Sequence, residues 1–235
     1  MKKIILFLIV SIRMFSLEGS FGIGSISTKD KYTGKEENIV IPTLNLKYGG
    51  FYFRGSELGY NSKIRDIEYG SSLQFSFGGN LKPEDVENKI LEERKAPLYL
   101  GLYGRQKVFN GGNLELKYQR EFQSTGDILS LSYSQFVKLN LPLLFIPYVR
   151  YSIRDKDYSN YYLGLRENEV AYWDTFYKSL DNSSKVDLGF TSSLFLTKKM
   201  SLSMIYNKEF LDDNKSKLVK ENDTSSFIAS LIYKF

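Results

Sequence analysis

The side chains that could support catalysis are few in this chain of 235 residues. It contains neither Cys nor His, which excludes a thiol nucleophile, a thiolate metal site, and any Ser-His or Asp-His mechanism. Four carboxylates stand near one another in one expected loop, namely Asp155, Asp157, Glu167 and Glu169, so hydrolysis by carboxylates alone stays formally open. Because loop carboxylates are far more often solvated surface, we predict that the protein is not an enzyme.

Motifs for metal ions and nucleotides are equally weak. Asp212, Asp213 and Asn214 offer oxygen ligands, but their spacing is not that of a calcium-binding loop and Lys215 follows at once. The Phe-Gly-Ile-Gly segment at 21–24 has no third glycine and no helix after it, so it does not match a dinucleotide-binding fingerprint. We therefore predict no metal and no cofactor.

The first sixteen residues have the features of an export signal. Lys2 and Lys3 precede an unbroken apolar run at 4–10, which is too short to span a bilayer, since a span needs roughly 20 residues. We predict a signal peptide at 1–16 and a mature chain at 17–235, with Arg13 blurring the cleavage point. The formal charge of +5 falls to +2 without the three basic residues of that segment, so nucleic acid is not an expected partner.

The mature chain alternates apolar and polar residues with a period of two, in runs of about ten residues. Two all-β folds give this pattern: a soluble sandwich buries the apolar face, and a membrane barrel turns it toward lipid. Very short links, such as 49–50, 110–112, 140–142 and 197–199, contrast with longer, charged links at 29–37, 79–94, 155–183 and 211–224. This contrast favours a transmembrane antiparallel up-and-down β-barrel. Aromatic residues near the ends of the runs fit interfacial girdles: Tyr48, Phe51, Phe77, Phe122, Phe210 and Tyr233.

The C-terminal residues are the most specific single feature. Phe227, Leu231, Tyr233 and the terminal Phe235 share one face of the expected last strand. A final strand that ends in aromatic-x-Phe resembles the signal that the barrel-assembly machinery of diderm bacteria recognises. We therefore predict the outer membrane as the location, with its lipid and that machinery as partners.

The number of strands is less certain from sequence than their existence. Eleven runs stand out, and bacterial single-chain barrels have an even number, so we predict about twelve strands, with ten as the fallback. The missing strand is expected within 155–183, where 158–165 and 172–180 are both strand-like. Within 51–60 the pattern changes face, which suggests a β-bulge near Gly55, and 82–94 suggests a short helix. The eleven runs are 20–27, 39–48, 51–60, 66–78, 97–107, 112–122, 128–139, 143–154, 185–196, 200–210 and 225–235.

The opposite face of these strands mixes both signs of charge, and buried charges must be paired or hydrated. The pattern allows either a salt-bridged interior or a narrow aqueous passage. The residues expected on this lumen face are Lys47, Glu68, Arg105, Lys107, Glu115, Lys117, Glu121, Lys138, Arg150, Asp187 and Glu209.

Several segments resemble the MipA/OmpV family of outer-membrane barrels, also called MltA-interacting proteins. They are 21–24, 31–34, 41–44, 48–55, 58–60, 161–165 (Tyr-Tyr-Leu-Gly-Leu), 206–210 and 231–235. The segment 211–224, rich in Lys and Asp, departs from the family pattern. The resemblance implies a scaffolding role, because one member is described as bridging a lytic murein transglycosylase and a murein synthase. It carries over no catalytic residues.

The expected function is therefore that of a non-enzymatic outer-membrane barrel, a scaffold or interaction protein for cell-envelope (murein) machinery. Murein hydrolase and synthase proteins are its expected protein partners. Two alternatives stay open from the sequence: a narrow passive channel for small solutes, and a surface adhesin acting through loop 155–183.

Overall fold

The fold is that of a computed structural model. It describes residues 17–76, 81, 91–139, 141–170, 179–212, 218–219 and 221–235. The expected signal peptide at 1–16 and most of the expected helix at 82–94 lie outside these residues.

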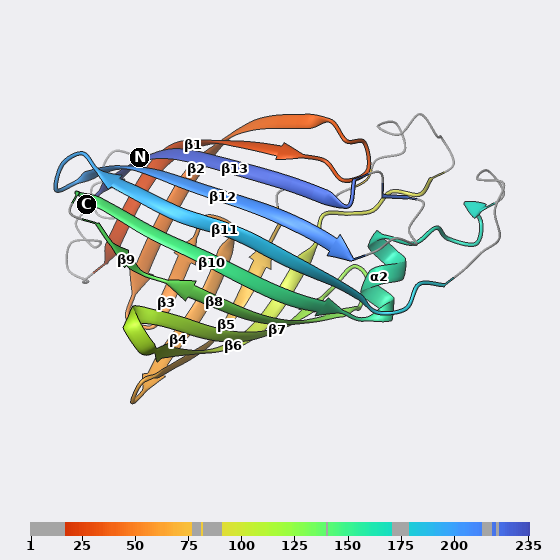
Figure 1. Cartoon of the computed structure of the whole chain (residues 1–235), viewed down its shortest axis with the longest axis horizontal. Coiled ribbons are helices and arrows are strands. Elements are labelled where there is room, and N and C mark those ends of the chain that lie inside the picture. Colours follow the sequence, from red (N-terminus) through yellow and green to blue (C-terminus); the bar gives the residue numbers. More distant parts are fainter. Residues whose placement is uncertain are drawn as a thin grey trace, which may run out of the picture.

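The described residues form a closed antiparallel barrel of twelve strands (Figure 1). Each strand pairs with its neighbours in sequence order, and the ring closes where β1 pairs with β13. The short β9 adds two residues beside β10, after the end of β8. The strands are β1 (Glu18–Lys29), β2 (Glu36–Tyr48), β3 (Phe51–Arg54), β4 (Glu57–Ile64), β5 (Ile67–Phe75), β6 (Leu98–Val108), β7 (Gly112–Glu121), β8 (Asp127–Gln135), β9 (Val137–Lys138), β10 (Leu143–Arg154), β11 (Ser183–Phe195), β12 (Met200–Asp212) and β13 (Asp223–Lys234).

The predicted total of twelve is confirmed, but the unrecognised strand lies elsewhere. The run at 51–60 is a hairpin of β3 and β4, joined by Gly55 and Ser56, and not one strand with a bulge. Gly55 has a φ of +57°, a conformation that glycine adopts without the steric cost that a Cβ brings. The turn explains the change of face, because the chain reverses direction at this glycine.

In the segment 155–183, the first strand-like stretch, 158–165, begins within a helix, and most of the second, 172–180, lies outside the described residues. Helix α2 (Lys156–Tyr162) begins after Asp155, whose carboxylate accepts a hydrogen bond of 2.9 Å from the Tyr158 backbone N–H. Tyr158 and Tyr162 are four residues apart, so they lie on one face, and both are buried. The aromatic residues that suggested a strand therefore lie on the buried face of a helix.

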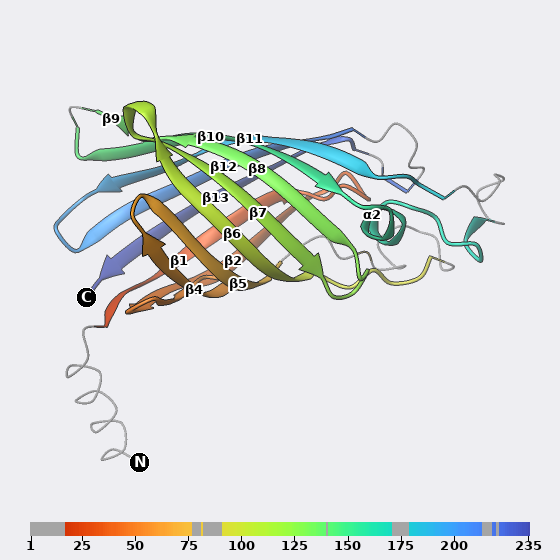
Figure 2. The same cartoon turned by 90° about the horizontal axis from the view of Figure 1, so that it is seen from below.

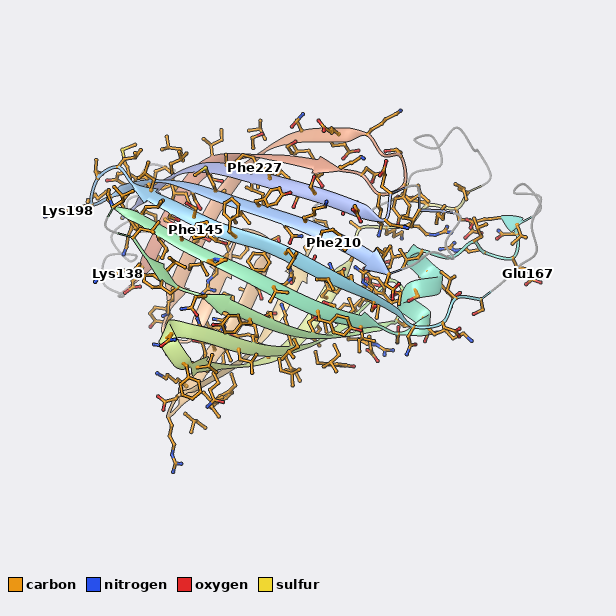
Figure 3. The ribbon with its side chains drawn as sticks, in the orientation of Figure 1. Lys138, Phe145, Glu167, Lys198, Phe210 and Phe227 are labelled. Atoms are coloured by element: carbon orange, nitrogen blue, oxygen red, sulfur yellow. The ribbon has the colours of Figure 1, made fainter. Side chains whose placement is uncertain are left out.

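The apolar face of the strands points outward, as the alternation predicts for a membrane barrel. Leu100, Leu102, Leu114 and Leu116 are among the large apolar side chains that are exposed on this face. Side chains project from the strands along the length of the barrel (Figure 3). An exposed apolar surface around a closed barrel is the surface that lipid covers. No helix in the described part of the chain is long and apolar enough to cross a membrane.

The two ends of the barrel differ in structure. The start of β1 and the C-terminus lie at one end, and α2 lies at the other (Figures 1 and 2). The end that holds the C-terminus also holds the short turns, including Gly49-Gly50, Arg65-Asp66 and 196–199. Short turns are periplasmic in outer-membrane barrels, and long loops are extracellular. We call these ends the periplasmic rim and the outer end.

The apolar core lies at the outer end and not in the middle of the barrel. Residues from several loops pack there against α2 into one buried cluster, which we call the loop cap. Because the barrel lumen is polar, this cap is where the loops gain hydrophobic stabilisation. The cluster comprises Tyr32, Leu81, Leu91, Ile128, Tyr158, Tyr162, Leu163, Leu180, Leu211, Leu218 and Val219.

Candidate functional site

One ion network lines the lumen along β4 to β7. Arg105 binds Glu115 through Nη2 at 2.5 Å and through Nε at 3.0 Å, and its Nη1 lies 3.4 Å from Glu68. Lys117 lies 3.6 Å from Glu57. The cross-strand register places these residues, since Arg105 pairs with Glu68 on one side and with Glu115 on the other. Facing positions thus place the Arg105 charge between two carboxylates.

A second network lies across the lumen on β10 to β12. Lys185 lies 2.6 Å from Glu209 and 3.2 Å from Asp187, and Arg154 Nη2 lies 3.3 Å from Glu209. The Arg154 side chain is almost fully buried, and its Nε and Nη1 atoms have no hydrogen-bond partner among the described residues. Its guanidinium carbon lies 5.2 Å from the centre of the Tyr158 ring. A buried guanidinium with two unsatisfied donors is energetically costly, so it marks a place where a ligand would be stabilised.

Two cavities occupy the lumen on either side of this arginine. The inner cavity, of about 390 Å³, is lined by both networks and includes Arg105, Glu115 and Arg150. The outer cavity, of about 660 Å³, lies under the loops and includes Lys29, Lys31 and Glu209. Arg154, Lys185, Tyr99 and Tyr158 line both. Of the two alternatives that the sequence left open, the described residues show salt bridges in the lumen, together with polar space between the charges.

The loop cap contains a fully buried ion pair. Arg94 Nη1 and Nη2 contact the two oxygens of Glu169 at 2.8 and 2.7 Å, and both side chains are 0% exposed. Glu169 also accepts bonds of 2.8 Å from the backbone N–H groups of Glu92 and Arg166. Arg94 donates further bonds to the carbonyl oxygens of Glu92, Tyr161 and Gly164. The pair joins the loop between β5 and β6 to the loop between α2 and β11, and its charged groups are satisfied by hydrogen bonds.

The outcome for the candidate carboxylates differs from the expectation in two places. Glu169 was expected on a solvated loop but is buried against Arg94. Glu121 was expected in the lumen but is buried at the β7–β8 turn, where it accepts bonds from the backbone of Gln123 and Ser124. Asp155 caps α2. Among the described residues, no cluster of three or more acidic side chains could hold a metal ion.

Lys31, in the loop between β1 and β2, reaches the outer cavity from the cap. Its Nζ atom lies 4.9 Å from the ring centre of Tyr32 and 5.7 Å from that of Tyr162. Burial, together with the positive charge of Arg154, lowers the pKa of Lys31 from 10.5 to about 8. Burial raises the pKa values of Tyr32 and Tyr162, so both rings stay neutral when Lys31 titrates.

The titration of Lys31 predicts a stability that depends on pH. Lys185 also disfavours the charged amine, and Glu209 and Asp30 favour it. Because the folded pKa lies below the unfolded value, the unfolded chain binds the extra proton between about pH 8 and 10.5. Stability should therefore rise with pH across this window, by at most about 1.4 kcal/mol per pH unit. Urea unfolding of the refolded barrel in lipid, at pH 7 to 10.5, measures the slope.

The control for this prediction is the variant Lys31→Met, which keeps the length of the side chain and removes the amine. Other groups titrate in the same window in both proteins, so the difference between the two slopes isolates Lys31. Equal slopes for Lys31→Met and the wild type would contradict the prediction.

The periplasmic rim carries an excess of exposed basic residues. Glu18, Asp66 and the terminal carboxylate are its acidic groups. None of the basic residues forms an ion pair within the described part of the chain. Lys138 and Lys198 mark this end in Figure 3, and Glu167 marks the other. Lys47, Lys107 and Lys138, expected in the lumen, are exposed at this rim. Its basic residues are Lys47, Lys63, Arg65, Lys107, Lys138, Lys198, Lys199 and Lys234.

The four residues of the expected assembly signal lie together on the outside of β13. Phe227, Leu231, Tyr233 and Phe235 are all exposed. The ring centres of Tyr233 and Phe235 lie 5.5 and 6.2 Å from that of Phe21 on β1. The aromatic residues therefore stand at the seam where the barrel closes. Recognition by the assembly machinery stays a prediction.

A closed antiparallel barrel with an apolar exterior, a charged lumen and short turns at one rim defines an outer-membrane β-barrel protein. The chain belongs to the MipA family, because the family model described as MltA-interacting protein MipA matches residues 21–235. Outer-membrane location in a Gram-negative-type bacterium follows from that membership.

Solved structures with a similar arrangement are remote in sequence. The NanC porin is 10% identical, with a TM-score of 0.42 over 94% of this chain and 100% of that one. A loop L8 deletion mutant of OmpT from Vibrio cholerae is 7% identical, with a TM-score of 0.41 over 94% and 98%. The β domain of the Bordetella autotransporter BrkA is 12% identical, with a TM-score of 0.38 over 94% and 100%. No curated protein sequence matches the chain.

Proposed function

We propose that this protein is a non-enzymatic interaction protein of the outer membrane that holds murein machinery at the periplasmic rim. The observation that carries the proposal is the basic rim, with eight exposed Lys and Arg side chains against three acidic groups. The family description as MltA-interacting protein supports it. Unpaired surface charges of one sign attract an oppositely charged partner and orient its approach. The expected partner is a murein hydrolase or synthase with an acidic face.

The outer end offers less support for the alternatives. A passive channel requires an open outer mouth, but the loop cap packs apolar residues and the Arg94–Glu169 pair there. An adhesin acting through 155–183 requires aromatic residues that are available to a host surface. Among the described residues of this loop, Tyr158 and Tyr162 are buried in the cap, and 171–178 lie outside the described part of the chain.

Charge reversal at the periplasmic rim tests the proposal. The triple variant Lys107→Glu, Lys138→Glu and Lys198→Glu should lower the recovery of murein enzymes from cross-linked envelopes by about tenfold or more. The reason is that each exposed charge pair contributes roughly 0.2–1 kcal/mol and reversal replaces attraction with repulsion. Quantitative mass spectrometry of the co-purified proteins measures this recovery.

The matched control reverses three exposed lysines at the outer end, with Lys35→Glu, Lys95→Glu and Lys156→Glu. It changes the net charge equally and should recover the enzymes as the wild type does. Failure of the wild-type protein to recover any murein enzyme would sink the proposal. Equal losses in the two triple variants would assign the effect to net charge and not to the rim.

A further inference from the structure

Among the described residues, no strand continues the barrel wall at its outer end between β2 and β5. Strand β3 has four residues, so on its β2 side it pairs with no more of β2 than Asn45–Tyr48. The last bond on this side runs from the Gly55 N–H to the Leu44 carbonyl at 2.9 Å. Strand β2 continues outward to Glu36, and no described strand pairs with that stretch on the β3 side. In Figure 2, β4 and β5 lie toward the periplasmic rim. We call this gap the side opening.

The sequence of β2 fits an edge that stays unpaired. The bond at Leu44 shows that even-numbered residues of β2 direct their backbone groups toward β3, so Pro42 is the next position that would donate an N–H across the gap. Proline has no N–H to donate, and it is characteristic of edge strands. Val40, two residues further out, lies on the outward face of β2 and is 69% exposed. Pro42 is therefore the residue that favours an unpaired edge at the side opening.

The outer cavity reaches this opening. Its lining includes Ile39 on one flank, Ser56 at the tip of the β3–β4 hairpin, and Phe75 and Pro97 on the other flank. Ile26 and Ile228 continue the apolar wall inward. The volume of about 660 Å³ lies within the range of small-molecule sites. A ligand entering from the membrane would first meet an apolar surface.

The far side of the same cavity holds three cationic side chains, Arg154, Lys185 and Lys31, together with the carboxylates of Asp30 and Glu209. Asp187 lies 3.2 Å from Lys185, so these charges balance, and the unsatisfied donors of Arg154 mark the position for a ligand. Arg154 is 4% exposed, and its Nε and Nη1 have no described partner. Nε–H and Nη1 lie on different edges of the guanidinium, so a carboxylate or phosphate oxygen in the cavity would accept a charge-assisted hydrogen bond from one of these two donors.

We propose that the outer cavity binds an anionic amphiphile that enters through the side opening. The anionic head binds Arg154 and Lys185, and the acyl chain lies along Ile26, Ile39 and Phe75 toward the outer leaflet. The binding is non-covalent and independent of the rim that holds murein machinery. Both a fatty acid and a phosphate-headed lipid have the required chemistry.

The test uses the full mature chain refolded in phosphatidylcholine nanodiscs, with folding checked by heat-modifiable gel migration. Electron paramagnetic resonance reports immobilisation of three probes at pH 7.5: spin-labelled stearic acid, a spin-labelled phosphate-headed lysolipid, and the uncharged methyl ester. At least one anionic probe should bind about tenfold more tightly than the ester, because hydrogen bonds to charged groups are the strong ones. The anionic probe that binds more tightly identifies the head group. Equal immobilisation of all three probes overturns the proposal.

Three variants locate the site. Arg154→Gln and Lys185→Gln should each weaken anionic-probe binding by about tenfold, and Ile39→Glu should weaken it by placing a negative charge at the opening. The matched control is Arg120→Gln, which removes an exposed guanidinium that pairs with Asp127 and should leave binding unchanged. If Arg154→Gln fails to fold, Lys185→Gln and Ile39→Glu still test the position of the site. Wild-type affinity in both would overturn the proposal.

Discussion

Glu169→Gln is expected to destabilise the loop cap by about 3–5 kcal/mol, the cost of leaving one member of a buried ion pair without its partner. The substitution keeps the size of the side chain and removes the charge that Arg94 contacts at 2.7 and 2.8 Å. Arg94 is 0% exposed, so water cannot replace the lost carboxylate without opening the cap. The barrel below has its own strand pairing, and we expect it to persist.

Two measurements separate the cap from the barrel. Backbone amides of the cap, including those of Leu163 and Gly164, should exchange hydrogen much faster in Glu169→Gln, while the strands keep wild-type exchange. Limited proteolysis should cut the loops and leave the strands intact. Unchanged exchange at these amides would show that the ion pair does not hold the cap.

Two controls accompany this variant. The double variant Arg94→Met/Glu169→Leu removes both charges and should recover most of the lost stability, because a well-packed apolar pair often matches a buried ion pair. Glu92→Gln breaks the more exposed pair with Arg166 and should cost no more than about 1 kcal/mol.

Phe235→Ala is expected to lower the amount of assembled barrel in cells several-fold, with little effect on the refolded protein. The reason is that the side chain is about half exposed on the outside of the barrel, so its share of the folded-state packing is small. We expect the assembly signal of Phe227, Leu231, Tyr233 and Phe235 to act on the chain before the barrel closes. Heat-modifiable gel migration of outer-membrane fractions measures the assembled amount.

Phe195 provides a matched control for this comparison. It ends β11 at the same rim and is 50% exposed, against 49% for Phe235. Phe195→Ala removes a similar apolar surface outside the last strand, and it should assemble normally. Equal losses in both variants would assign the effect to lipid contact and not to recognition.

The strands could be predicted from the sequence because the alternation of apolar and polar residues is a local pattern. Alternation along Leu114–Leu116–Tyr118 places one face in lipid, whatever the strand pairs with. Two local features were misread. Gly55 was interpreted as a bulge, since four residues of β3 are too few to show a period. Tyr158 and Tyr162 are compatible with a strand as well as with a helix. Their packing within the loop cap selects the helix.

The site was harder to predict because its contacts are distant in the chain. Arg94 and Glu169 are 75 residues apart, and the intervening loops show no periodicity that would bring them together. The sequence places Arg154 at the end of a strand. The unsatisfied donors that mark it as a binding residue appear only when β10, β12 and α2 are assembled. The excess of Lys at the short turns was visible, but only closure of the barrel gathers those turns into one rim.

The seam between β1 and β13 has a kinetic consequence. It joins Ser20 to Lys234, which lie near opposite ends of the chain, and the Phe235 N–H reaches the Gly19 carbonyl at 3.1 Å. Pairing of such long range is slow, since the whole intervening loop must be closed first. Until the last strand arrives, β1 presents an open edge on which foreign strands can grow. The last thirteen residues therefore complete the sheet and also cover the exposed edge of β1. That edge stays prone to aggregation until the final residue is in register.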